Sequence, residues 1–124
     1  NKDVREIMKK FQKKIIQKNK RICVEGRDIA STILKKNPRY DIAFYFSCNL
    51  NLASIRRWKD LKKKVPLKEV KKSLSIRTKL DKKRKHSPLK KMRDAILIRT
   101  DKLNKKKVLI KMSQEIEKIN YKTL

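Results

Sequence analysis

The residues best suited to chemistry in this sequence are charged side chains at helical spacing. Read in steps of three and four, one face of the stretch 67–85 passes from apolar residues to Arg77, Asp81 and Arg84. These spacings put one carboxylate within reach of both guanidiniums. Two arginines aligned by one aspartate form a fork suited to bidentate phosphate recognition. The alternative, for this helix alone, is an exposed ion-pair ladder worth roughly 0.2–0.5 kcal/mol per pair.

A second charged pair follows the only glycine of the chain. The short, mostly apolar stretch 21–25 predicts a strand that stops at Gly26, and Arg27 and Asp28 come directly after it. Ligands of open α/β sheets bind at the carboxyl ends of strands, and glycine permits a tight turn or a close approach. The pattern therefore predicts a ligand site at this edge of a sheet, with a solvated turn as the alternative.

Arginine is rare in this chain, with 10 copies against 29 lysines. A position that keeps arginine in such a background is expected to need the planar, five-donor group that lysine cannot replace. Two of these arginines are neighbours and point about 100° apart on a helix, so at most one of the two can face a given site. The positions that we single out are Arg5, Arg27, Arg56, Arg57, Arg77 and Arg84.

Hydrophobic periodicity predicts alternating helices and strands. We expect helices at 4–15, 51–63, 67–85 and from 104 onward, and strands at 21–25, 41–47 and 95–99. Asn51 and Asn104 are the expected helix caps. The run 41–47 is almost entirely apolar, as in a strand buried on both faces. This order predicts an α/β fold with a parallel sheet flanked by helices.

The formal net charge of +27 over 124 residues favours nucleic acid or another anionic partner. The lysines, however, are spread along the whole length, and isoleucine and asparagine are abundant with them. We interpret this as codon bias in an AT-rich genome, which leaves most lysines on a solvated surface. A small basic protein that binds RNA or ribosomes through phosphate contacts is the alternative.

Cysteine usage and hydropathy exclude further classes. Two cysteines and one histidine are too few for the four ligands of a zinc site, so no metal site is expected. Cys23 and Cys48 are predicted to be reduced core residues of a cytoplasmic protein. The longest uncharged run, 42–55, is too short and too polar to span a bilayer, which takes about 20 apolar residues.

Together the motifs resemble bacterial cytidylate kinase, in the family's order and close to its spacing. The matching residues are Val4-Arg5-Glu6, Gly26-Arg27-Asp28-Ile29, Arg56-Arg57, Arg77 with Asp81 and Arg84, and Ser87-Pro88-Leu89 with Asp94-Ala95. The resemblance implies a P-loop nucleoside-monophosphate kinase fold. It also implies transfer of the γ-phosphoryl group of ATP, with Mg²⁺, to CMP or dCMP. A kinase with another acceptor base is a further alternative.

The resemblance implies three roles on the acceptor side. Arg5 would help to read the cytosine base, and Asp28 would accept a hydrogen bond from its exocyclic amine. Arg27 would hold the phosphate of the acceptor nucleotide. Phosphoryl transfer depends mainly on positioning and electrostatic stabilisation, so no nucleophilic side chain is needed.

Further roles fall on the donor side and on a mobile lid. Arg77 and Arg84 would clamp phosphates from the lid and stabilise charge on the transferred group. Asp81 would contact the sugar or orient these arginines. One of Arg56 and Arg57 would approach the ATP phosphates.

Four positions in three motifs depart from the family's pattern and bear more on the ATP side than on the acceptor side. The chain has Arg77-Thr78 where the family has Arg-Asp, and Ala30-Ser31 where the family has Gly-Thr. It has Arg99 where the family has an acidic residue after the strand.

The glycine count predicts that a segment of the kinase is missing. A Gly-x-x-x-x-Gly-Lys-[Ser/Thr] phosphate loop needs two glycines, and this chain has one. We expect the chain to be the C-terminal part of one domain, with 1–57 and 87–124 in the core and 58–86 in a helical lid. The loop that binds most of Mg²⁺-ATP would precede Asn1, so the chain alone should not catalyse. The complete protein would be a cytoplasmic monomer of pyrimidine nucleotide metabolism, with nucleotides as partners and no specific nucleic acid or membrane.

Overall fold

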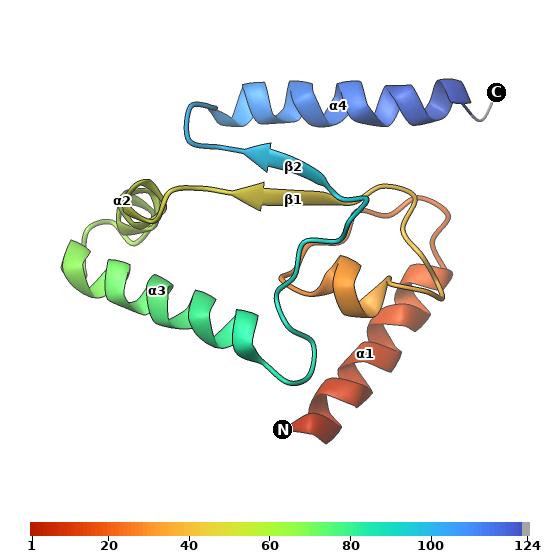
Figure 1. Ribbon diagram of the computed structural model, residues 1–124, viewed down its shortest axis with the longest axis horizontal. Coiled ribbons are helices and arrows are strands. Elements are labelled where there is room, and N and C mark those ends of the chain that lie inside the picture. Colours follow the sequence, from red (N-terminus) through yellow and green to blue (C-terminus); the bar gives the residue numbers. More distant parts are fainter. Residues whose placement is uncertain (123–124) are drawn as a thin grey trace. The chain divides into compact units, whose positions relative to one another are not determined.

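Four α-helices, one π-helical turn and two short strands are found in residues 1–122, which a computed structural model describes (Figure 1). In chain order they are α1 (Lys2–Gln17), η1 (Ile29–Ile33), β1 (Phe44–Ser47), α2 (Leu50–Asp60), α3 (Leu67–Lys83), β2 (Ile96–Arg99) and α4 (Lys105–Lys122). The chain forms two compact units. The first contains Asn1–Asp41 and Arg77–Arg93, and the second contains Ile42–Ile76 and the chain from Asp94 on.

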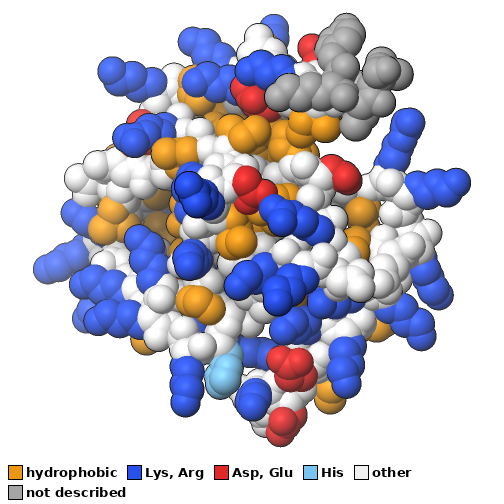
Figure 2. All heavy atoms as spheres, turned by 45° about the vertical axis from the view of Figure 1, so that its right-hand side comes forward, with side chains coloured by type: hydrophobic (Ala, Val, Ile, Leu, Met, Phe, Trp, Pro, Cys, Tyr) orange, Lys and Arg blue, Asp and Glu red, His pale blue; other side chains and the backbone are white. Residues whose placement is uncertain are grey.

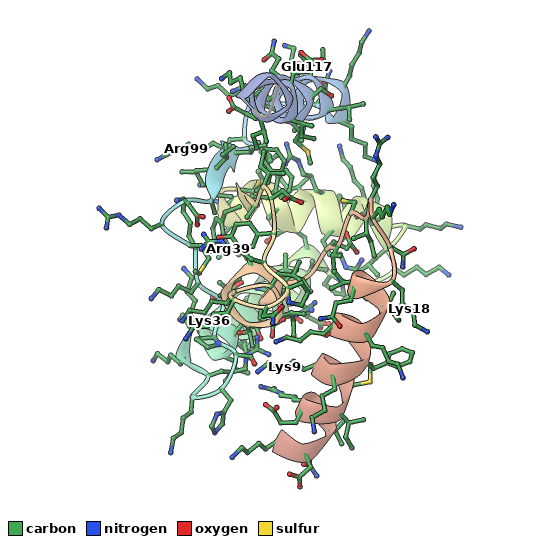
Figure 3. The ribbon with its side chains drawn as sticks, turned by 90° about the vertical axis from the view of Figure 1, so that its right-hand side faces the viewer. Lys9, Lys18, Lys36, Arg39, Arg99 and Glu117 are labelled. Carbon is green, nitrogen blue, oxygen red and sulfur yellow. The ribbon has the colours of Figure 1, made fainter. Side chains whose placement is uncertain are left out.

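The second unit is built on a two-stranded parallel sheet. Phe44 of β1 pairs with Ile96 of β2, and the register continues to Ser47 and Arg99. Two of the three predicted strands are therefore confirmed, as is a mixed α/β arrangement with a parallel sheet. Phe46 is 50% exposed, so β1 is not buried on both faces as its apolar run predicted. Helix α4 runs back along β2 (Figures 1 and 3).

The predicted strand at 21–25 is wrong. A strand needs a neighbour to complete its backbone hydrogen bonds, and the sheet in the described residues contains β1 and β2 only. Cys23 is accordingly exposed and is not a core residue, whereas Cys48 is partly buried. Val24 still contributes to packing, because it lies against the small apolar cluster of the first unit.

The core of the first unit consists of Ile29, Ile33 and Leu34, all at most 9% exposed. They come from or directly follow η1, the unlabelled orange turn that lies against α1 in Figure 1. The helix predicted at 4–15 is confirmed as part of α1. Its apolar stripe is nevertheless exposed, by 42% to 66%, and consists of Val4, Ile7, Met8, Phe11 and Ile15.

Asparagine caps fix two helix starts beside the sheet. Asn104 Oδ1 accepts from Lys107 N–H at 2.9 Å, which confirms the predicted cap of α4. Helix α2 starts earlier than predicted, because Asn49 has a non-helical backbone and its Oδ1 accepts from Asn51 N–H at 2.8 Å. Asn49 N–H in turn donates to Asp101 Oδ1 at 2.9 Å. The cap position therefore lies at Asn49, where the turn after β1 is held against the turn after β2.

We expect Asn49→Ala to lower the free energy of unfolding by about 1 kcal/mol, because it removes a side-chain cap from α2. Asn51→Ala is the matched control. It keeps the backbone N–H that the cap binds and should change stability by less than about 0.5 kcal/mol. Urea unfolding followed by circular dichroism at 222 nm measures both. Equal effects of the two substitutions would contradict the assigned cap.

Candidate functional site

Asp81 of α3 is the centre of a charge cluster in the first unit. Arg27 Nε lies 2.6 Å from Asp81 Oδ2, Arg84 Nη1 lies 3.6 Å from Oδ1, and Arg77 Nε lies 3.9 Å from Oδ2. The Asp81 side chain is 13% exposed, whereas that of Arg77 is 66% exposed. Three guanidiniums against one carboxylate leave two positive charges uncompensated, which suits a doubly charged anion such as a phosphate monoester.

Several polar atoms of this cluster are buried without a hydrogen bond. The Arg27–Asp81 contact is close, but it lacks the angle of a hydrogen bond. Arg27 Nε, Asp81 Oδ2 and Arg84 Nε therefore have no hydrogen-bond partner among the described residues. Unsatisfied buried polar atoms are rare in folded proteins, and a functional role is one of the usual reasons. The polar groups of the cluster are thus not fully satisfied by one another.

A cavity of about 190 Å³ in the first unit includes Arg84 in its wall. Arg5, Lys9 and Gln12 from α1 share that wall with Asp28 and Ser87. Lys9 projects from α1 toward the side of the helix on which η1 lies (Figure 3). The volume is below the roughly 300–1,000 Å³ of sites for whole drug-sized ligands. It has room for a single base or a single phosphate group.

The segment after α3 is fixed at three points around this cavity. Arg5 Nη1 donates to the carbonyl of His86 at 3.3 Å, and Ser31 Oγ donates to the carbonyl of Pro88 at 3.3 Å. Leu89 N–H returns to the Asp81 carbonyl at 2.8 Å. These bonds satisfy carbonyl groups at the helix end and beyond it, which no helical partner reaches. They hold Arg84 and Ser87 at the cavity wall.

Gly26 does not end a strand. It lets the side chain of Ile29 pack close to its backbone. A Cβ at this position would lie 2.7 Å from Ile29 Cγ1, so a side chain would displace Ile29 from the core. Ile29 begins the π-helical turn η1, whose backbone bonds include Leu34 N–H to the Ile29 carbonyl at 2.7 Å. Such turns are frequent at functional sites. Ile29 is buried, whereas Arg27 and Asp28, which directly precede the turn, are partly exposed.

The two arginines predicted to approach ATP phosphates differ in environment. The Arg56 guanidinium donates to Thr100 Oγ1 at 3.0 Å, to the Thr100 carbonyl at 2.8 Å and to the Leu103 carbonyl at 3.4 Å. It fastens α2 to the turn between β2 and α4 within the second unit. Arg57 is exposed. Of the predicted pair, Arg57 is therefore the one whose guanidinium the fold leaves accessible.

Sequence reasoning missed several polar residues of the site. Thr78 Oγ1 accepts from Arg27 Nη2 at 3.3 Å, and Ser31 holds the segment after α3. Both stand at positions that depart from the family's pattern, which is the only feature that could have marked them. Gln12 and Ser87 line the cavity. Gln12 follows Arg5 by seven residues, or two helical turns, so helical spacing could have found it.

Other site classes find no support in the described part of the chain. No group of three or more His, Cys, Asp or Glu side chains in residues 1–122 could hold a metal ion. None of the helices described is long and apolar enough to cross a membrane. On the face shown in Figure 2, lysine and arginine side chains are scattered among other residues rather than gathered in one basic patch.

Comparison with known proteins finds one family. A sequence model of the cytidylate kinase family matches residues 1–118. Cytidylate kinases of Rickettsia akari, Rickettsia bellii and Clostridium botulinum are 30%, 33% and 32% identical to this chain. The alignments cover 93%, 94% and 94% of the chain, and 52%, 54% and 53% of the respective relatives. The chain thus spans about half the length of the curated relatives it matches.

Arg56→Lys should lower the free energy of unfolding by about 1–3 kcal/mol, because an ammonium group cannot reproduce the hydrogen bonds to Thr100 and Leu103. Arg57→Lys, on the adjacent exposed residue, keeps the same charge and should stay within about 0.5 kcal/mol of the wild type. Thermal unfolding of both variants at one salt concentration makes the comparison. If both variants unfold together with the wild type, the hydrogen bonds of Arg56 do not support the fold.

Proposed function

Because the chain belongs to the cytidylate kinase family, we propose that it carries the acceptor side of a kinase active site. The reaction would transfer the γ-phosphoryl group of ATP to CMP or dCMP and yield CDP or dCDP. The fold of the whole domain would be that of P-loop nucleoside-monophosphate kinases, with residues 58–86 as its lid. The observation that carries this proposal is that the first unit alone brings together a polar cavity and a cluster of guanidiniums.

Base recognition is proposed for the cavity. The Asp28 carboxylate accepts hydrogen bonds only, which suits the exocyclic amine of cytosine and opposes the carbonyl that uracil has at the same position. The Arg5 guanidinium offers donors only, which suits the carbonyl oxygen and ring nitrogen of cytosine. Arg5 already donates to the His86 carbonyl, which fixes its direction at the cavity wall. Together these two residues would select cytosine by opposite hydrogen-bonding character.

Phosphate binding is proposed for the arginine cluster. Arg27 would hold the phosphate of CMP, while Arg77 and Arg84 would stabilise charge that spreads over the oxygens of the transferred group. Asp81 would contact the sugar or keep the three guanidiniums in place. The exposure of Arg77, at 66%, would leave it free to engage a ligand as the lid closes. Arg57, or Arg56 after release from its present bonds, would serve the ATP phosphates.

Mg²⁺ bound with ATP would neutralise negative charge on the β- and γ-phosphates. The described residues contain no cluster of metal-ligating side chains. The side chains assigned to the first unit would act on the acceptor nucleotide and on the transferred group. Binding of CMP to the first unit is the part of the proposal that this chain can test directly.

We expect the 124-residue chain to bind CMP more tightly than UMP. Arg27→Gln should weaken CMP binding roughly 10- to 100-fold, because a hydrogen bond to a charged group is worth about 1.5–3 kcal/mol. Arg21→Gln removes the same charge from an exposed position of the same unit and should leave the affinity within about twofold. Calorimetric titration gives the affinities, and circular dichroism shows that the variants are folded. Absence of CMP binding, or equal binding of CMP and UMP, would contradict the proposal.

Binding of random-sequence RNA separates this function from the RNA-binding alternative. If the lysines form a solvated surface, affinity for a single-stranded RNA of random sequence should be weak, in the range of about 10⁻⁴–10⁻⁶ M at physiological salt. Fluorescence anisotropy with a labelled RNA measures it. Nanomolar binding that persists at physiological salt would instead favour the RNA-binding alternative.

A further inference from the structure

Arg27 is held along one edge of its guanidinium. Its Nε lies against Asp81 Oδ2 at 2.6 Å, and its Nη2 donates to Thr78 Oγ1 at 3.3 Å. The Asp81 contact lacks hydrogen-bond geometry, so the bond to Thr78 is the hydrogen bond that the structure records for this side chain. An ion pair constrains distance, whereas a hydrogen bond also constrains direction. Thr78 therefore adds a directional restraint on the plane of the Arg27 guanidinium to the close contact with Asp81.

The opposite end of the same guanidinium is available. No partner of Arg27 Nη1 is recorded among the described residues, and the side chain is 32% exposed. The two N–H groups of Nη1 point away from the edge that Asp81 and Thr78 occupy, because the guanidinium is planar. A phosphate approaching from the solvent would meet these donors already oriented. Less conformational entropy is then lost when the phosphate binds.

Thr78 orients Arg27 without neutralising it. A hydroxyl oxygen accepts a hydrogen bond but carries no charge, so the cluster keeps three positive groups against the single carboxylate of Asp81. A carboxylate at position 78 would leave one uncompensated charge instead of two. In the middle of a helix, a threonine hydroxyl commonly bonds the carbonyl four residues earlier. Here its recorded partner is Arg27, which comes from a distant part of the chain.

We propose that Thr78 is a positioning residue that directs Nη1 of Arg27 toward the phosphate of the acceptor nucleotide while preserving the cluster's excess positive charge. The inference rests on the proposed function, in which Arg27 binds that phosphate. It assigns to Thr78 a contribution to phosphate affinity and none to base recognition. CMP and cytidine differ only by the phosphate, so their comparison isolates this contribution.

The test uses three substitutions in the 124-residue chain. Thr78→Val removes the hydroxyl at nearly constant shape and should weaken CMP binding about five- to tenfold while cytidine binding stays within about twofold. Thr78→Ser restores the acceptor and should recover most of the CMP affinity. Thr32→Val, a change of the same kind outside the cavity and the cluster, is the control and should alter neither affinity.

NMR titration with CMP and with cytidine gives the affinities, and the guanidinium resonances of Arg27 report whether rotation of its Nη groups is hindered. We expect hindered rotation in the wild type and in Thr78→Ser, and free rotation in Thr78→Val. If Thr78→Val binds CMP as tightly as the wild type does, the proposed role of Thr78 is overturned, but the proposed function is not. Equal losses for CMP and cytidine would assign Thr78 a merely structural role and also overturn it. Failure of the wild type to bind CMP at all would overturn the proposed function together with this inference.

Discussion

The candidate site depends on one partly buried carboxylate. Like charges about 4 Å apart repel by about 4 kcal/mol at an effective dielectric constant of 20, so guanidiniums do not gather unless a negative group lies among them. Asp81 supplies that group, with Arg27, Arg77 and Arg84 within 2.6 to 3.9 Å of its oxygens. One carboxylate is enough to hold the cluster together and too little to neutralise it. The same imbalance makes the cluster attractive to an anion.

Holding the cluster in place requires contacts between distant segments. Arg27 precedes the π-helical turn η1, whereas Asp81 lies near the end of α3. The chain after α3 would be free to move if its backbone groups had only water as partners. Instead, side chains from α1 and η1 donate to the carbonyls of His86 and Pro88, and Leu89 returns to the Asp81 carbonyl. The carbonyl groups beyond a helix end, which need partners in any case, are thus used to assemble the cavity.

Interactions within one helix were predictable from the sequence, and those between segments were not. The spacing of Arg77, Asp81 and Arg84 predicts their contacts, because helix geometry alone brings these residues together. Nothing local indicates that Arg27 joins Asp81, since this contact depends on how η1 packs. The prediction of a strand at 21–25 was wrong for a related reason. An apolar run indicates burial, but a strand also needs a hydrogen-bonding neighbour. The family resemblance supplied a shared role for Arg5, Arg27 and Asp28, which periodicity could not connect.

Scarcity of arginine singled out positions in the sequence, but not what each guanidinium binds. Arg56 and Arg27 differ in the partners that their guanidiniums bind. The Arg56 guanidinium donates hydrogen bonds to Thr100 and Leu103, which belong to the same unit. Arg27 uses one edge on Asp81 and Thr78 and leaves Nη1 without a recorded partner among the described residues. A guanidinium bonded through both Nη groups within its own unit stabilises the protein, whereas one bonded along a single edge keeps donors that a ligand could use. The distinction becomes visible only when the acceptors around each nitrogen are known, because the residue type is the same in both cases.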